Sequence, residues 1–327
     1  MEQSTERVQE VFKTTRTLCV GRFLIDVPLT ATVVHGAMWV PYDLIRLPKE
    51  APNIDEHIQK LISELDGKRH LAARELRGER GVLGKVVDGA LPGQRIFFGL
   101  SGMASFYKIR SLIPIADDLF IQTAIPVRDG NDYGSTVQEL NSVARRIVSR
   151  GDNELPRESG FCVDGALVRD SDNPKVEKIQ MGIRLKEFPD VHFSLELLRG
   201  DYIVESDAIE PRLAAARRDA IAAGFGDWFE RIKTLRRGER TLGAWKGFEV
   251  LARLPAQKDQ GESHDFNFVA LGEAKNPSVP ALDMKLDTGV EDNRPGAIPP
   301  SISDAEAVYL WDKLTNSLRL RPVTASK

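Results

Sequence analysis

The sequence predicts an α+β fold of two similar domains, each built from an antiparallel or mixed β-sheet and two main helices. Its 327 residues exceed the roughly 250 to 300 at which a single hydrophobic core stops growing. Both halves repeat the order strand, helix, strands, helix. A polar segment without apolar periodicity separates them. We therefore expect an N-terminal domain over residues 1–150, a linker over 151–157 and a C-terminal domain over 158–327.

The N-terminal half alternates strand and helix signals. Its apolar patterns predict strands over 18–27, 32–40 and 43–47, and a meander over 81–127 punctuated by Gly, Pro and Asp-Asp turns. Apolar residues at helical spacing between Ile54 and Leu76 predict a helix, opened by Asn53 and Glu56 as a capping pair. A second helix is expected over about 136–149, capped by Ser135 with Gln138.

The C-terminal half repeats this order. The patterns predict a strand over 161–168, a hairpin over 178–198, and strands over 247–254, 265–271 and 281–286. Between them a helix starts at Pro211, an allowed first-turn residue, breaks at Gly224 and continues after Asp227. Ser303 and Glu306 predict a capping box for a last helix.

A shared motif favours an internal duplication. Residues 76–85 and 235–247 both contain Arg-Gly-Glu-Arg followed closely by Leu-Gly, and both follow the predicted long helix of their half. Because the motif recurs at the same position in both halves, the sequence predicts that the two domains are related.

Composition argues against nucleic-acid and membrane partners. The formal charge is −3, so no global field attracts polyanions, and the basic cluster from Arg231 to Arg240 is interpreted as the solvated face of an amphipathic helix. No apolar run is long enough to span a bilayer, and the N-terminus has no apolar h-region. We expect a soluble, monomeric chain without membrane insertion.

The two cysteines, Cys19 and Cys162, each lie in an apolar, strand-like run. Two cysteines are too few for a disulfide scaffold or a Cys-rich metal site. The pattern favours two buried free thiols over a bridge.

The search for catalytic motifs predicts a protein that is not an enzyme and binds no cofactor or metal. The five histidines are scattered without metal-ligand spacing. Ser101 lacks the flanking glycines of a nucleophile elbow and is expected in a hairpin turn. The four tryptophans lie in core-like runs, and packing is the favoured interpretation; they are Trp39, Trp228, Trp245 and Trp311.

Two segments, CVGRFLIDVP within residues 18–28 and ESGFCVDGALV at 158–168, resemble the lipase-cognate immunity proteins of type VI secretion, fourth class. The resemblance implies a two-domain inhibitor that binds a phospholipase effector, grips its lid region and prevents lid opening. It also implies a periplasmic location, for which a signal peptide would have been removed from the chain as given.

The binding residues are predicted from loops, where recognition usually lies. The candidate loops cover residues 128–134 and 256–265, and the effector-binding candidates are Asp129, Asp132, Tyr133, Asp259 and Glu262. An alternative function is a two-domain small-molecule binding module whose cleft closes on a solute. A metabolite that raises the melting temperature would support it.

Overall fold

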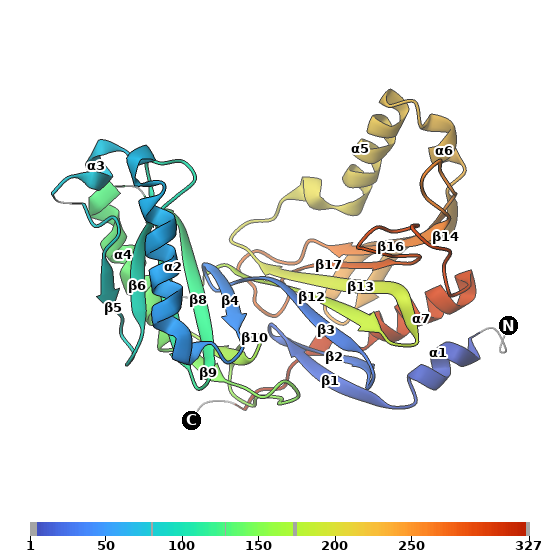
Figure 1. Cartoon of the computed structure of the whole chain (residues 1–327). Coiled ribbons are helices and arrows are strands. Elements are labelled where there is room, and N and C mark those ends of the chain that lie inside the picture. The colour runs from blue at the N-terminus through green and yellow to red at the C-terminus, as the bar shows by residue number, and fades with distance from the viewer. Residues whose placement is uncertain (1–4, 80, 128, 173–174, 325–327) are drawn as a thin grey trace. The chain divides into compact units, whose positions relative to one another are not determined.

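The computed structural model describes residues 5–79, 81–127, 129–172 and 175–324 (Figure 1). The fold is mixed α+β, with mostly antiparallel sheets, as the sequence predicts. Its residues form two compact units. Unit 1 contains the chain up to Gly36 together with Asn153–Arg157 and Lys175–Val323. Unit 2 contains Ala37–Asp152 and residues 158–172.

These units differ from the predicted division at residues 151–157, because the N-terminal hairpin belongs with the C-terminal half. In unit 1 the last strand, β18 (Arg319–Leu320), pairs with β2 (Phe23–Pro28), so that Leu320 lies opposite Phe23. Such long-range pairing leaves no trace in local sequence patterns. The internal duplication is not confirmed. In the two copies of the shared motif, residues 235–240 lie in a strand, whereas residues 74–77 form a helix and Arg80 lies outside the described residues.

Neighbouring strands in the main sheet of unit 1 pair in an antiparallel way. Its strands, in spatial order, are β14 (Lys233–Leu242), β15 (Trp245–Leu254), β16 (Ser263–Ala270), β17 (Ala281–Asp287), β13 (Phe188–Arg199) and β12 (Glu177–Leu185). Next in order comes β3 (Thr32–Trp39), and the division between units falls inside this strand. A smaller sheet joins β1 (Thr15–Val20), β2 and β18.

The helices of unit 1 lie on both faces of its main sheet. They are α1 (Glu6–Val11), α5 (Ile209–Ala222), α6 (Gly226–Glu230), α7 (Asp304–Asn316) and the 3₁₀ turn η4 (Glu205–Asp207). Trp311 of α7 packs edge-on against Phe193 and Phe266, with ring centroids 6.0 and 6.1 Å apart. On the same face Phe23 of β2 packs against Trp245 at 4.7 Å. This face is the hydrophobic core of unit 1.

Unit 2 holds a second antiparallel sheet and a small one. The larger, in spatial order, is β4 (Asp43–Leu47), β8 (Asp118–Val127), β7 (Tyr107–Ile115), β6 (Arg95–Leu100) and β5 (Val86–Asp88). The smaller is β10 (Gly160–Val163), β11 (Ala166–Arg169) and β9 (Ile147–Ser149). The helices are η2 (Ala51–Asn53), α2 (Ile54–Asp66), η3 (Arg69–Leu71), α3 (Arg74–Arg77) and α4 (Asp129–Ala144). Ile58 of α2 packs on Leu112 and Leu119 of the larger sheet.

Two predicted single strands are hairpins. Residues 18–27 belong to β1 and β2, which turn at Gly21 with φ of 55°, and residues 161–168 belong to β10 and β11, which turn at Gly165 with φ of 63°. Both angles lie in the left-handed region that glycine enters without steric cost. The glycine inside each apolar run was therefore the missed turn signal.

The predicted helix starts are confirmed in part. Ser303 and Glu306 form the predicted capping box of α7. Asn53 precedes α2 but makes no capping bond; its amide donates instead to Glu50 Oε2 at 3.1 Å. Helix α4 begins at Asp129, before the predicted Ser135 cap, and residues 147–149 form β9. Helix α5 begins two residues before Pro211, which lies in its first turn.

Three packing predictions were wrong. The basic cluster from Arg231 to Arg240 lies largely in strand β14, not on a helix. Trp39 is 39% exposed, although Trp245 and Trp311 are buried as predicted. Neither cysteine is free: Cys19 and Cys162 are both disulfide-bonded. The reason is common to all three, since burial and pairing depend on neighbours that are remote in sequence.

A buried carboxylate links the edge of the unit 1 sheet to α7. Glu249 of β15, 2% exposed, accepts hydrogen bonds from Arg236 Nε at 2.5 Å, from Arg240 and from Trp311 Nε1 at 2.6 Å. Arg236 also donates to Asp312 of α7 at 2.5 Å. Arg236 and Arg240 lie four residues apart on a strand, so they project from the same face toward α7.

Replacing Glu249 with Ala is expected to lower the free energy of unfolding by about 3–5 kcal/mol, because two half-buried guanidinium groups and an indole N–H lose their shared acceptor. Urea denaturation measures the change. The matched control, Glu239→Ala, removes an exposed carboxylate of β14 and should change stability by less than about 0.5 kcal/mol. Equal effects of the two substitutions would refute the structural role of Glu249.

Candidate functional site

The first predicted binding loop, residues 128–134, is mostly the start of helix α4. The ring of Tyr133 packs edge-on against Phe98 and Tyr107, with centroids 5.4 and 6.3 Å apart. It is thus half-buried in the core of unit 2. Arg128 and the side chains of Asp129 and Asp132 lie outside the described residues. The prediction that these residues bind an effector stays untested.

The second predicted loop joins β15 to β16 and is shorter than predicted, because β16 begins at Ser263. Asp259 lies exposed in the turn between Gln257 and Gln260. Glu262 is also exposed and forms an ion pair with Arg253. Both carboxylates are accessible, and their binding role stays a prediction.

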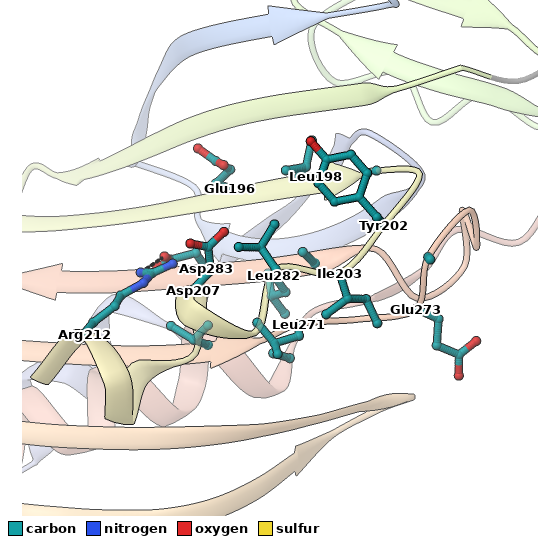
Figure 2. Close-up of a pocket in the computed structure, with 16 residues that line it drawn as sticks. Glu196, Leu198, Tyr202, Ile203, Asp207, Arg212, Leu271, Glu273, Leu282 and Asp283 are labelled. Atoms are coloured by element: carbon teal, nitrogen blue, oxygen red, sulfur yellow. Dashed lines mark hydrogen bonds and ion pairs between the residues drawn. The ribbon is translucent and has the colours of Figure 1, made fainter. Parts of the chain in front are cut away.

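A more defined feature is a pocket in unit 1 that no sequence pattern singled out. We call it the acidic recess. It lies beside the ends of β13, β16 and β17, next to the segment that leads into α5 (Figure 2). Leu198 of β13, Leu282 of β17 and Leu271, which directly follows β16, lie on its apolar side. The residues from Tyr202 to Val204 form its rim.

The rim of the acidic recess is apolar and exposed. Tyr202, Ile203 and Val204 are 78%, 44% and 40% exposed. Three consecutive exposed apolar side chains are unusual on a protein that has no partner, because contiguous apolar surface normally becomes buried in the core or in an interface. The predicted elements ended at residue 198 and resumed at 211, so this segment had no assignment. Its apolar run between polar neighbours was the available signal.

The recess is acidic. Its lining contains four carboxylates and one guanidinium, a formal excess of three negative charges; the charged residues are Glu196, Asp207, Glu273, Asp283 and Arg212. Arg212 of α5 donates to Asp283 at 2.6 Å, as the dashed line in Figure 2 marks. Lys178, outside the recess, pairs with Glu196 at 2.9 Å. The rest of the negative charge faces solvent.

At the other ends of the same strands, the sheet face opposite the core is polar. His192, Asp287 and Asp265 lie in one cross-strand row on β13, β17 and β16. Lys285 Nζ lies 3.1 Å from Asp287 Oδ1 and 3.6 Å from Asp265 Oδ1. Burial raises the pKa of Asp287 to about 6 despite Lys285, while burial and then repulsion by Arg184 lower the pKa of His192 to about 4. Burial therefore opposes the charged forms of both groups.

The raised pKa of Asp287 predicts a pH-dependent stability. Its ordinary pKa is 3.8, so the folded state binds the proton more tightly than the unfolded state does. The resulting contribution to the free energy of unfolding is fully present below pH 3.8 and is lost as the pH rises through about 6. Asp287→Asn keeps the neutral form. We expect the stability of this variant, relative to the wild-type protein, to increase by about 1–3 kcal/mol from pH 4 to pH 7. A difference that stays constant across this range, measured by urea denaturation, would contradict the prediction.

Other kinds of site are not found in the described part of the chain. It contains no group of three or more His, Cys, Asp or Glu side chains placed to hold a metal ion. Among the same residues, no helix has the length and apolar character needed to cross a membrane. Ser101 lies in the turn after β6, as predicted.

The fold and the recess define a mixed α+β protein with an exposed, acidic and apolar surface feature. The family described as Tle cognate immunity protein 4, C-terminal domain, matches residues 154–323, more than half of the chain. The chain therefore belongs to this family of immunity proteins of type VI secretion lipases.

Solved structures share the fold. The immunity protein TplEi of the type VI secretion system from Pseudomonas aeruginosa, complexed with a peptide called "L", is 23% identical, with a TM-score of 0.71 over 95% of this chain and 99% of that one. The crystal structure of a Tle4–Tli4 complex matches with 23% identity and a TM-score of 0.73 over 95% of this chain and 98% of that one. Comparison with curated protein sequences gave no match.

Proposed function

We propose that this chain is an immunity protein that binds a type VI secretion phospholipase effector and inhibits it without any catalysis of its own. Membership of the Tle cognate immunity protein 4 family carries the proposal. The similar fold of a chain in the crystal structure of a Tle4–Tli4 complex supports a protein partner. Family membership favours this function over the alternative of a solute-binding module.

The proposed mechanism holds the lid of the effector closed. A lipase that acts at a lipid surface must open its lid to admit substrate. An inhibitor that binds the closed state more tightly than the open state shifts the population toward the closed state. Shifting a lipase from 99% open to 99% closed requires a preference of about 10⁴-fold. The inhibitor needs only a large complementary surface, typically about 800 Å² on each partner.

Accessible side chains of the predicted loop support a role at the interface. Asp259 and Glu262 present exposed carboxylates between β15 and β16. Tyr133 is a weaker candidate, because its ring packs against Phe98 and Tyr107. We retain Asp129 and Asp132 as proposed contacts on position alone, at the first turn of α4.

The chain and its cognate type VI secretion lipase effector are expected to form a stable complex on size-exclusion chromatography. Co-expression should also rescue cells in which that lipase is directed to the periplasm. Purified chain should abolish the hydrolysis of phospholipid vesicles at a stoichiometric ratio.

A lipase variant with its lid cross-linked open separates binding from mechanism. If the chain inhibits by holding the lid closed, this variant should bind at least ten-fold more weakly than the same variant with its cross-link reduced. Equal affinity would reject the lid mechanism but leave the inhibitor role intact. If the wild-type lipase forms no complex, the proposed function is wrong.

We also propose a periplasmic location. Cys19 and Cys162 are both disulfide-bonded, and disulfides persist in oxidising compartments such as the periplasm. A folded protein that depends on a disulfide is better suited to that compartment than to the reducing cytosol.

When cells are fractionated without reductant, the chain should appear in the periplasmic fraction and resist labelling by maleimide after denaturation. Replacing both cysteines with serine should lower the free energy of unfolding by about 2–5 kcal/mol. The control is the reduced wild-type protein, which should lose a similar amount. Recovery of the chain in the cytoplasmic fraction, with complete maleimide labelling, would contradict the periplasmic location.

A further inference from the structure

We propose that the acidic recess is a docking site for a segment of the effector in which a lysine or arginine lies beside an apolar side chain. This inference rests on the proposed function and adds to it the place on unit 1 and the chemistry of the partner segment. Its basis is the juxtaposition of an exposed apolar rim, Tyr202 to Val204, with a lining that carries an excess of negative charge.

Backbone hydrogen bonds on both sides of the apolar rim restrain it in an exposed position. Asp207 N donates to Val204 O at 3.0 Å and Ala208 N donates to Glu205 O at 3.1 Å, which closes the turn η4. At the other end of the segment, Lys275 N donates to Gly200 O at 2.8 Å. These bonds restrain the segment before any partner arrives, so binding orders less of the chain and loses less conformational entropy.

The exposed rim favours a protein partner over a small solute. A pocket for a small molecule buries most of its ligand between apolar walls. Here Tyr202 is 78% exposed, and in Figure 2 its ring stands beside Leu198 at the edge of the recess. Aromatic side chains of this kind are the residues that most often dominate protein interfaces when a partner covers them.

The negative charge of the recess favours a partner segment with a positive charge. Arg212 and Lys178 pair with Asp283 and Glu196, whereas Asp207 lies on the exposed η4 turn. Glu273 accepts a neutral donor, the amide of Asn276, at 2.6 Å. A partner ammonium or guanidinium group would gain these carboxylates as acceptors, and long-range attraction would also raise the association rate. The same charge repels nucleic acid and anionic lipid surfaces.

Two double variants test the proposal in the full-length chain. Tyr202→Ser with Ile203→Ser removes the apolar rim, and Asp207→Lys with Glu273→Lys reverses the exposed charge. We expect each to weaken binding to the cognate lipase effector by at least ten-fold in isothermal titration calorimetry. The charge variant should also show a weaker dependence of affinity on salt concentration than the wild-type chain.

Matched controls come from exposed residues of unit 1 outside the recess. Leu29→Ser changes an apolar side chain that is 57% exposed, and Glu10→Lys reverses an exposed charge. Both should bind like the wild-type chain. All variants change exposed side chains, so their melting temperatures should stay close to that of the wild-type chain.

The outcomes separate this inference from the proposed function. If the wild-type chain does not bind the lipase, the proposed function fails. If the wild-type chain binds and both recess variants bind equally well, the docking site is wrong and the proposed function stands. A photo-crosslinking residue at position 202 identifies the contacted segment by mass spectrometry. Capture of a segment without a basic side chain would also overturn the inference.

Discussion

The carboxylate of Glu249 constrains the architecture of unit 1. It is buried, and its oxygens accept bonds from two arginines of β14 and from the indole of α7. A buried charge is tolerated only when its partners are all in place. Strand β14, strand β15 and helix α7 must therefore assemble together. This arrangement packs Trp311 against Phe193 and Phe266 and closes the core on one face of the sheet.

Closing that face assigns the other face to solvent, because side chains alternate along every strand. His192, Asp265, Lys285 and Asp287 consequently gather on the polar face, where each strand contributes its solvent-facing positions. Helix α5 touches this face through a small apolar cluster of Ile209, Val250 and Val269. The segment that leads into α5 thus passes over the ends of the strands, and the acidic recess forms between them (Figure 2).

The surface features of unit 1 agree with the binding role that we propose. The recess offers an exposed apolar rim and unneutralised carboxylates, which suit recognition of a second protein. The fold itself is shared with solved structures that are 23% identical over nearly the whole chain.

Local sequence patterns determined the α+β class, most strand positions and the capping box of α7, because these depend on neighbours within a few residues. The same patterns missed the turns at Gly21 and Gly165, since one glycine within an apolar run is a weak signal. The resemblance of residues 18–28 and 158–168 to a known family identified the protein class, although these segments form strands and carry no catalytic motif.

Tertiary structure alone decided the pairing of remote segments. It joined β18 to β2, placed both cysteines in disulfide linkage, and gathered residues from Glu196 to Asp283 around one recess. It also showed that Tyr202 to Val204 are exposed, whereas Tyr133, predicted on a binding loop, packs in a core. The physical reason is that burial, ion pairing and disulfide bonding depend on which surfaces meet in space, and sequence periodicity describes only which face of each element is apolar.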